Sequence, residues 1–169
     1  MAQKAGELAA SGVDVISLSL GEPDFPTPEH IKEAAKRAID ENFTRYTPVA
    51  GYPSLRKAIS ENMRSQGLDF APEQIVVSNG AKQALSDVIL ATVNPGDEVI
   101  IPTPAWVSYV EMVKIARGVP VTVPATIESD FKITPAALEA AITPKTRMVM
   151  LNSPSNPTGS IYLREELQA

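Results

Sequence analysis

Short apolar runs alternate with longer amphipathic segments from residue 75 to the end of the chain. Short apolar runs are typical of strands covered on both faces, and apolar residues three and four positions apart are typical of helices that bury one side. The runs predict strands at 75–78, 98–101, 119–123 and 148–151. The amphipathic segments predict helices at 82–93, 106–116 and 135–141, and another that begins at 163. This order indicates an α/β fold with a mainly parallel sheet and helices on both faces, in three layers.

The first 65 residues carry three further helical patterns. They predict helices at 3–10, 28–40 and 53–65. Thr27 is the expected cap of the second helix, because Pro28 suits a first helical position. Residues 15–20 include apolar side chains that alternate with serine, which predicts a half-buried strand.

Composition excludes several classes of function. A chain of 169 residues suits one domain with a real core, and a net charge of −5 disfavours nucleic acid or an anionic membrane as the main partner. No apolar run approaches the roughly 18 residues of a membrane helix. The absence of cysteine excludes disulfides and thiolate sites and makes the cytoplasm the expected location. A single histidine, His30, argues against a histidine triad or a histidine-rich metal site, so we expect no metal.

Both ends of the chain lie in helical patterns. The first pattern starts at Gln3, and the last, 163–169, consists of opening helical turns without a terminating residue. We interpret the chain as a piece of something longer.

Candidate chemistry follows the predicted strands, because parallel sheets bind ligands beyond the carboxyl ends of their strands. After 75–78, Gly80, Ala81 and Lys82 open a helix whose small residues, free N–H groups and dipole favour an anion such as phosphate. The alternative is a tight turn with Lys82 in solvent, and neither a Walker nor a dinucleotide glycine pattern is present.

Two other strand ends carry an aromatic and an amide side chain. Trp106 follows the strand at 98–101 and either offers its face to a flat ligand or packs in the core. Asn156 lies between Pro154 and Pro157 in a stiff loop, which is a candidate for a cis peptide bond. Its side-chain amide either faces a ligand or belongs to a plain turn.

Taken together and in order, five motifs resemble the class I, fold-type I aminotransferases, which use pyridoxal phosphate, and among them most the bacterial aspartate aminotransferases. The motifs are Gly21-Glu-Pro-Asp-Phe-x-Thr-Pro28, Tyr46-x-Pro-x-x-Gly51, Asn79-Gly-Ala-Lys-Gln-Ala-Leu85, Pro104-x-Trp-Val-Ser-Tyr109 and Asn152-Ser-Pro-Ser-Asn-Pro-Thr-Gly159. The resemblance covers essentially the whole chain.

The resemblance implies a role for each strand-end loop. Gly80, Ala81 and Lys82 are similar to the cup that holds the cofactor phosphate. Trp106 is similar to the aromatic residue that stacks on the pyridine ring, and Asn156 to the amide that hydrogen-bonds the phenolic oxygen.

The resemblance also implies substrate contacts and a partner subunit. Tyr46 is similar to a tyrosine that reaches the cofactor phosphate of the other subunit, which implies a homodimer. Gly21 matches the backbone position that meets the substrate α-carboxylate, and Trp106 and Asn156 also border the substrate. Lys82 matches a position that, in one bacterial subgroup, pairs with the distal carboxylate of an acidic substrate.

Other positions are interpreted structurally or weaken the assignment of substrate. Glu22, Asp24 and His30 are interpreted as loop structure and helix capping. Ala105 departs from the tyrosine often found before the stacking residue, which loosens the assignment of the substrate.

The family's remaining catalytic groups are expected beyond Ala169. They are the lysine that carries the cofactor, an aspartate against the pyridine nitrogen and an arginine for the α-carboxylate, so no catalytic residue is assigned in this chain. Residues 1–29 are expected to belong to the small domain and 30–169 to the first half of the large domain, with the C-terminal half of the fold missing.

The family sheet has seven strands in the order 3-2-4-5-6-7-1. The strand at 75–78 would therefore lack its neighbour, and we expect a polypeptide of these residues alone to be unstable and inactive.

The implied function is transfer of an amino group to a 2-oxo acid such as 2-oxoglutarate, with aspartate as the expected donor, in two ping-pong stages. One alternative is another enzyme on the same scaffold, such as an aromatic or alanine aminotransferase or a C–S lyase. A second is an aminotransferase-like regulatory module, which would carry a DNA-binding domain ahead of this part. The segment before Gly21 is too short and not basic enough for that domain.

Overall fold

The computed structural model describes residues 2–16, 21 and 23–169 of the chain. It divides into two compact units, Met1–Thr47 and Pro48–Ala169, which are described separately. Among the described residues, no helix is both long and apolar enough to cross a membrane.

The first unit contains helices α1 (Ala2–Ala10) and α2 (Glu29–Asp40). Pro28 occupies the N-cap position of α2, with ψ of 141°, so the expectation that Thr27 caps the helix and Pro28 is its first residue is wrong by one position. The extended ψ keeps Pro28 out of the helix, and its carbonyl accepts hydrogen bonds from the backbone N–H groups of Ile31 and Lys32. Of the strand expected at 15–20, residues 15 and 16 are not in a strand, and 17–20 lie outside the described residues, as does Glu22.

The second unit begins with α3 (Pro53–Ser65) and a 3-10 turn, η1 (Pro72–Gln74). Ser60, only 2% exposed, donates from Oγ to the carbonyl oxygen of Phe70 at 2.6 Å. The Nε of Arg56 donates to the carbonyl oxygen of Ile75 at 2.9 Å. These two bonds hold the segment after α3 against that helix.

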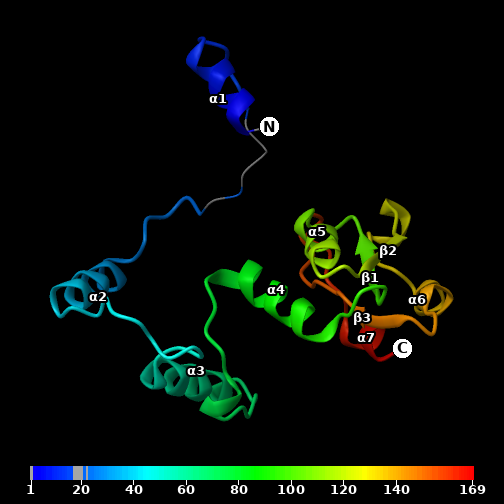
Figure 1. The fold of residues 1–169 in the computed structure, drawn as a ribbon. Helices are drawn as coiled ribbons and strands as arrows, with labels where there is room; N and C mark the ends of the chain where they lie inside the picture. Colours follow the sequence, from blue (N-terminus) through cyan, green and yellow to red (C-terminus); the bar gives the residue numbers. More distant parts are fainter. Residues whose placement is uncertain (1, 17–20, 22) are drawn as a thin grey trace. The chain divides into compact units, whose positions relative to one another are not determined.

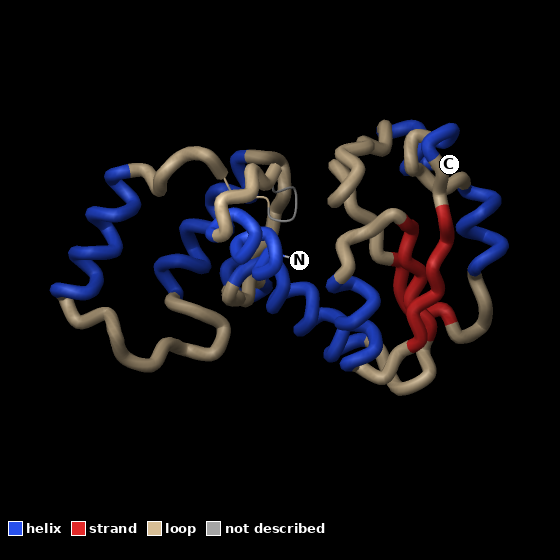
Figure 2. The backbone as a smooth tube through the Cα atoms, turned by 90° about the horizontal axis from the view of Figure 1, so that it is seen from above, coloured by secondary structure: helices blue, strands red, loops and turns tan. Residues whose placement is uncertain are grey.

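Three parallel strands form the sheet: β1 (Glu98–Thr103), β2 (Val119–Pro124) and β3 (Thr146–Val149). Their order is β2-β1-β3, which places the second predicted strand between the third and the fourth and confirms the expected 3-2-4 order. The pairing of β1 with β3 continues past Val149, where the N–H of Met150 donates to the carbonyl oxygen of Ile100 at 2.9 Å. Figure 2 shows the three strands, in red, side by side.

The prediction of a strand at 75–78 is wrong. Ile75 has extended dihedrals (φ −110°, ψ 129°), but 75–78 joins no ladder, and Val77 donates its N–H to the carbonyl oxygen of Ala50 instead. An extended segment becomes a strand only when a neighbour pairs with its backbone groups. This agrees with the expectation that the segment lacks its neighbouring strand: the sheet consists of β2, β1 and β3, and residues 75–78 pair with none of them.

Helices cover both faces of the sheet, which confirms the three-layer arrangement. Successive side chains of β1 point to opposite faces of the sheet. Val99 and Ile101 pack in a cluster with Ile89 of α4 (Gly80–Thr92) and Val113 of α5 (Ser108–Ile115). Ile100, between them in β1, lies outside that cluster. Figure 1 shows α5 and α6 (Pro135–Ala141) on opposite sides of the strands.

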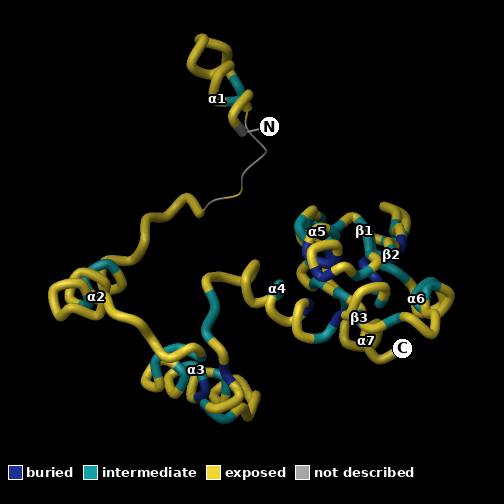
Figure 3. Tube along the Cα trace, viewed as in Figure 1, coloured by how far each residue is buried: buried dark blue, intermediate teal, exposed yellow. Residues whose placement is uncertain are grey.

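The second face is covered less completely. An apolar groove between α6 and α7 (Arg164–Gln168) is lined by Leu138, Val149 and Leu167 among others. Figure 3 shows the buried residues of the second unit gathered mainly around β1 and α5. The face of the sheet that α4 and α5 cover is therefore the better-packed one.

Candidate functional site

The N-terminus of α4 begins at a glycine that the backbone conformation requires. Gly80 has φ of +77°, a left-handed value that side chains rarely adopt, and a Cβ built there would contact nothing within 4 Å. The preceding Asn79 is fixed, because its N–H donates to Oε1 of Gln83 at 2.7 Å. The first N–H groups of a helix have no carbonyl partner within the helix, so this exposed turn is suited to an anion.

Lys82 of α4 and Trp106, which precedes α5, meet in space. The Nζ of Lys82 lies 4.8 Å from the centroid of the Trp106 ring, in a cation–π contact. Lys82 is exposed but does not extend freely into solvent. The structure therefore joins two residues that the sequence singled out separately.

Trp106 packs partly into the core, one of the two alternatives that the sequence left open. It is half-buried and packs against the cluster formed by β1, α4 and α5. Its ring also meets the edge of Tyr109, with centroids 5.5 Å apart and planes at 90°. The indole is thus fixed on one side by the core while its contact with Lys82 lies at the N-terminus of α4.

The loop that carries Asn156 is tied together by its own hydrogen bonds. The N–H of Asn156 donates to Oδ1 of Asn152 at 2.7 Å, and the N–H of Ser155 donates to the carbonyl oxygen of Ser160 at 2.9 Å. The Ser153–Pro154 and Asn156–Pro157 bonds are cis, which confirms the expectation for this loop. The Asn156 side chain is exposed.

The loops after β1 and β3 share a small cavity. It is lined by Ala105 and Tyr109 from the β1 side and by Asn152 and Asn156 from the β3 side. Tyr109 also contacts Trp106, which in turn contacts Lys82. The structure thus brings Lys82 and Trp106 together, and through Tyr109 links them to the cavity that Asn156 lines.

Two predicted site residues belong to the first unit. Tyr46 is fully exposed, and Gly21 is also exposed. Their roles toward a cofactor or substrate stay predictions. Among the described residues, no group of three or more His, Cys, Asp or Glu side chains could hold a metal ion.

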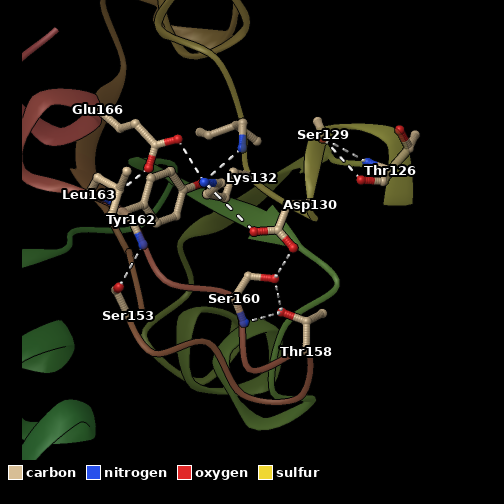
Figure 4. A network of polar contacts seen from close by, with 11 residues as sticks. Thr126, Ser129, Asp130, Lys132, Ser153, Thr158, Ser160, Tyr162, Leu163 and Glu166 are labelled. Atoms are coloured by element: carbon tan, nitrogen blue, oxygen red, sulfur yellow. Dashed lines mark hydrogen bonds and ion pairs between the residues drawn. The ribbon is translucent and has the colours of Figure 1, made fainter.

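A polar network beside the Asn156 loop was missed by sequence reasoning (Figure 4). Tyr162 accepts the N–H of Ile133 at its hydroxyl (2.8 Å), and its own N–H donates to Oγ of Ser153 (3.0 Å). Ser160, 7% exposed, donates from Oγ to Oδ1 of Asp130 at 3.4 Å. The only available signal was the position of Ser160 and Tyr162 directly after the Asn-Pro-Thr-Gly motif.

An ion pair extends this network to α7. Lys132, whose side chain is 18% exposed, lies 2.7 Å from Oε1 of Glu166 and 3.7 Å from Oδ2 of Asp130. The hydrogen bond with Glu166 raises the pKa of Lys132. The same bond, together with the N–H of Leu163, lowers the pKa of Glu166. Both groups therefore favour their charged forms.

Comparison with known proteins agrees with this geometry. The family model described as "Aminotransferase class I and II" matches residues 13–169. Aspartate/prephenate aminotransferase of Cereibacter sphaeroides is 58% identical over 167 residues, and aspartate aminotransferase of Geobacillus stearothermophilus is 54% identical over 168 residues. These matches cover 98% and 99% of this chain.

A solved structure, aspartate aminotransferase from Thermus thermophilus with maleate, superimposes with a TM-score of 0.94 at 49% identity. The superposition covers 99% of this chain and 44% of that one. The chain spans about two fifths of the length of the relatives it matches, 42% for the Cereibacter protein and 43% for the Geobacillus protein. Because the family model matches residues 13–169, nearly all of the sequence, the chain belongs to the class I and II aminotransferases.

Proposed function

We propose that the chain forms part of a pyridoxal-phosphate-dependent aminotransferase that transfers the amino group of aspartate to a 2-oxo acid such as 2-oxoglutarate. The observation that carries the proposal is the contact between Lys82 and Trp106, whose neighbour Tyr109 lines the same cavity as Asn156. A cation, an aromatic face and an amide are there supplied by three separate elements.

The donor set fits pyridoxal phosphate. The first turn of α4 at Gly80 and Ala81, with Lys82, supplies N–H groups and positive charge for a phosphate. Trp106 would supply a flat face for the pyridine ring and shield that ring from water. Asn156 would supply an amide that donates to the ionised phenolic oxygen. When bound, the cofactor supplies an electron sink for the bond that breaks at the substrate Cα.

Lys82 has a second proposed role, in choosing the substrate. Its charge lies beside Trp106 rather than in an ion pair with an acidic side chain of the described part of the chain. A second carboxylate on the substrate would provide that missing counter-charge. The Thermus thermophilus relative was solved with maleate, a dicarboxylate, which supports this role.

The remaining assignments are proposals from the resemblance. Gly21 would meet the substrate α-carboxylate, and Tyr46 would reach the phosphate in the other subunit of a homodimer. Residues 1–29 would belong to the small domain and 30–169 to the large domain, in a cytoplasmic enzyme.

The test uses this chain followed by the part of the Cereibacter sphaeroides relative outside the matched region, here called the joined enzyme. Replacing Lys82 by Ala should lower kcat/KM for aspartate about tenfold to a hundredfold, because a charge-assisted hydrogen bond contributes about 1.5–3 kcal/mol. With pyridoxal phosphate saturating, so that the loss of the Lys82 charge beside the cofactor phosphate is offset, the kcat/KM for alanine or phenylalanine should fall much less.

Lys114→Ala is the matched control, because Lys114 pairs only with Glu111 on the exposed surface of α5 and should affect no substrate. Equal losses for acidic and apolar amino acids in Lys82→Ala would overturn the choice of substrate. A joined enzyme that binds no pyridoxal phosphate and transfers no amino group would overturn the proposed function.

A further inference from the structure

Residues 130–133, here called the 130–133 turn, have an unusual backbone. Asp130 and Phe131 both have φ of 53°, in the left-handed region. Asp visits this region with some frequency, but a bulky residue such as Phe is an outlier there. Such a conformation persists only where surrounding contacts hold it.

The 130–133 turn contacts the Asn156 loop at three points. The Phe131 side chain lines the small cavity together with Asn152 and Asn156. The carboxylate of Asp130 accepts the hydroxyl of the buried Ser160, and the N–H of Ile133 donates to the hydroxyl of Tyr162. Figure 4 shows these bonds converging on the segment from Ser153 to Tyr162.

The loop that receives these contacts is closed by its own hydrogen bonds. Ser155 and Ser160 are joined by a backbone bond of 2.9 Å, and Tyr162 is joined to Ser153 by the 3.0 Å bond from its N–H to Oγ. Asn156 lies inside the segment that these two bonds close. A shift at Tyr162 is therefore transmitted to Asn156, whose own side chain is exposed and forms no hydrogen bond with another described residue.

We propose that Tyr162 is a positioning residue: its hydroxyl, held by the N–H of Ile133 in the 130–133 turn, sets the position of Asn156 for its contact with the cofactor. This inference rests on the proposed function. Placement errors of about 1 Å are enough to weaken an oriented hydrogen bond substantially. The left-handed conformation of Asp130 and Phe131 is then the cost of presenting Ile133 and Phe131 to the loop.

The test measures binding of pyridoxamine 5′-phosphate to the joined enzyme, since this cofactor form binds without a covalent bond to lysine. We compare Tyr162→Phe, which keeps the ring and removes the hydroxyl, with Asn156→Ala and with the double variant. Tyr162→Phe should raise Kd about tenfold. In the Asn156→Ala background the same change should raise Kd less than twofold, because Tyr162 acts through Asn156.

Ser65→Ala is the control, because it removes an exposed hydroxyl on α3 that bonds only to the carbonyl oxygen of Asn62, and Kd should stay unchanged. Additive effects of Tyr162→Phe and Asn156→Ala would overturn the inference and leave the proposed function standing. An unchanged Kd in Asn156→Ala would instead overturn the proposed contact of Asn156, and the inference with it.

Hydrogen exchange separates positioning from general loss of folding. In Tyr162→Phe the N–H groups of Ser155, Asn156 and Gly159 should exchange about tenfold faster, while those of β1 keep their protection. If β1 also loses protection, Asp130→Gly replaces the variant: it tolerates the left-handed backbone and removes the carboxylate oxygen that accepts the Ser160 hydroxyl. Unchanged exchange in the 155–159 segment in Asp130→Gly would overturn the inference.

Discussion

Lys132 and Glu166, 34 residues apart in the chain, are joined through Nζ and Oε1 at 2.7 Å. The pair connects the 130–133 turn to α7, and Oε2 of the same glutamate accepts the N–H of Leu163 at 2.6 Å. A single carboxylate thus both pairs with a lysine and caps the start of the helix that follows the Asn156 loop.

The first prediction concerns pH. The pKa of Glu166 is lowered from its ordinary value of 4.5. The stability that its carboxylate gives the folded state is therefore complete above pH 4.5 and is lost as pH falls through the lowered pKa. The pKa of Lys132 is raised from 10.5. The stability that its ammonium group gives the folded state is therefore complete below pH 10.5 and is lost as pH rises through the raised pKa. Urea unfolding of the joined enzyme should show Lys132→Met less stable across the neutral range.

The difference between parent and Lys132→Met should shrink at both extremes of pH. Lys114→Met, which breaks an exposed pair with Glu111, should change the urea midpoint little at any pH. A Lys132→Met difference that stays constant from pH 3 to pH 7 would contradict the role of the Glu166 carboxylate.

A second prediction concerns Gly118, at the start of β2. A Cβ there would lie 2.7 Å from Cγ1 of Val93 and 3.2 Å from the carbonyl oxygen of Asp97, which cannot move without shifting the strand. Gly118→Ala should therefore lower the free energy of unfolding by about 1–3 kcal/mol. Gly6→Ala is the control, because a Cβ in α1 meets nothing within 4 Å and alanine favours a helix. Equal midpoints for Gly118→Ala and the parent would show that β2 can adjust.

A third prediction concerns two serines of α3. Ser60 is buried and donates to the carbonyl oxygen of Phe70, whereas Ser65 is exposed and donates to the carbonyl oxygen of Asn62. Ser60→Ala should lower the free energy of unfolding by about 1 kcal/mol or somewhat more, since it leaves a carbonyl without its donor where water is largely excluded. Ser65→Ala should lower it by much less. Hydrogen exchange of α3 would compare the two variants, and similar exchange would show that water replaces the Ser60 hydroxyl.

The sheet and the strand-end loops were predictable because they depend on local patterns. Apolar runs locate β1, β2 and β3, and the proline pairs around Asn156 predict a cis bond. The segment at 75–78 has the same apolar pattern, but strand formation depends on a free neighbour, which periodicity does not reveal.

The 130–133 turn was missed for a related reason. Its left-handed residues, Asp130 and Phe131, are held by contacts with residues about 30 positions away rather than by glycine or asparagine in the turn itself. Nothing in the local sequence around Phe131 predicts a positive φ. Local bonds from the N–H groups of Asp130 and Phe131 to the carbonyl oxygens of Ile127 and Thr126 close the turn, and contacts with distant residues hold it against the Asn156 loop.

The fourth prediction concerns the Trp106 ring. Trp106→Leu removes the edge contact with Tyr109, worth about 0.5–1.5 kcal/mol, and the cation–π contact with Lys82, worth about 0.5–1 kcal/mol at an exposed site. The free energy of unfolding of the joined enzyme should fall by about 1–2 kcal/mol. Trp106→Phe keeps an aromatic face and should cost less.

A double-variant cycle isolates the contribution of Lys82. Lys82→Met should lower the free energy of unfolding by about 0.5 kcal/mol in the parent, because it replaces the cation over the ring with a neutral side chain of similar length. In the Trp106→Leu background the same change should cost nothing, because the ring that attracts the ammonium group is gone. Unfolding in urea at low and high salt would measure both differences. An equal cost of Lys82→Met in both backgrounds would show that something other than the indole face stabilises the ammonium group. The contact between Lys82 and Trp106 would then contribute nothing to the free energy of unfolding.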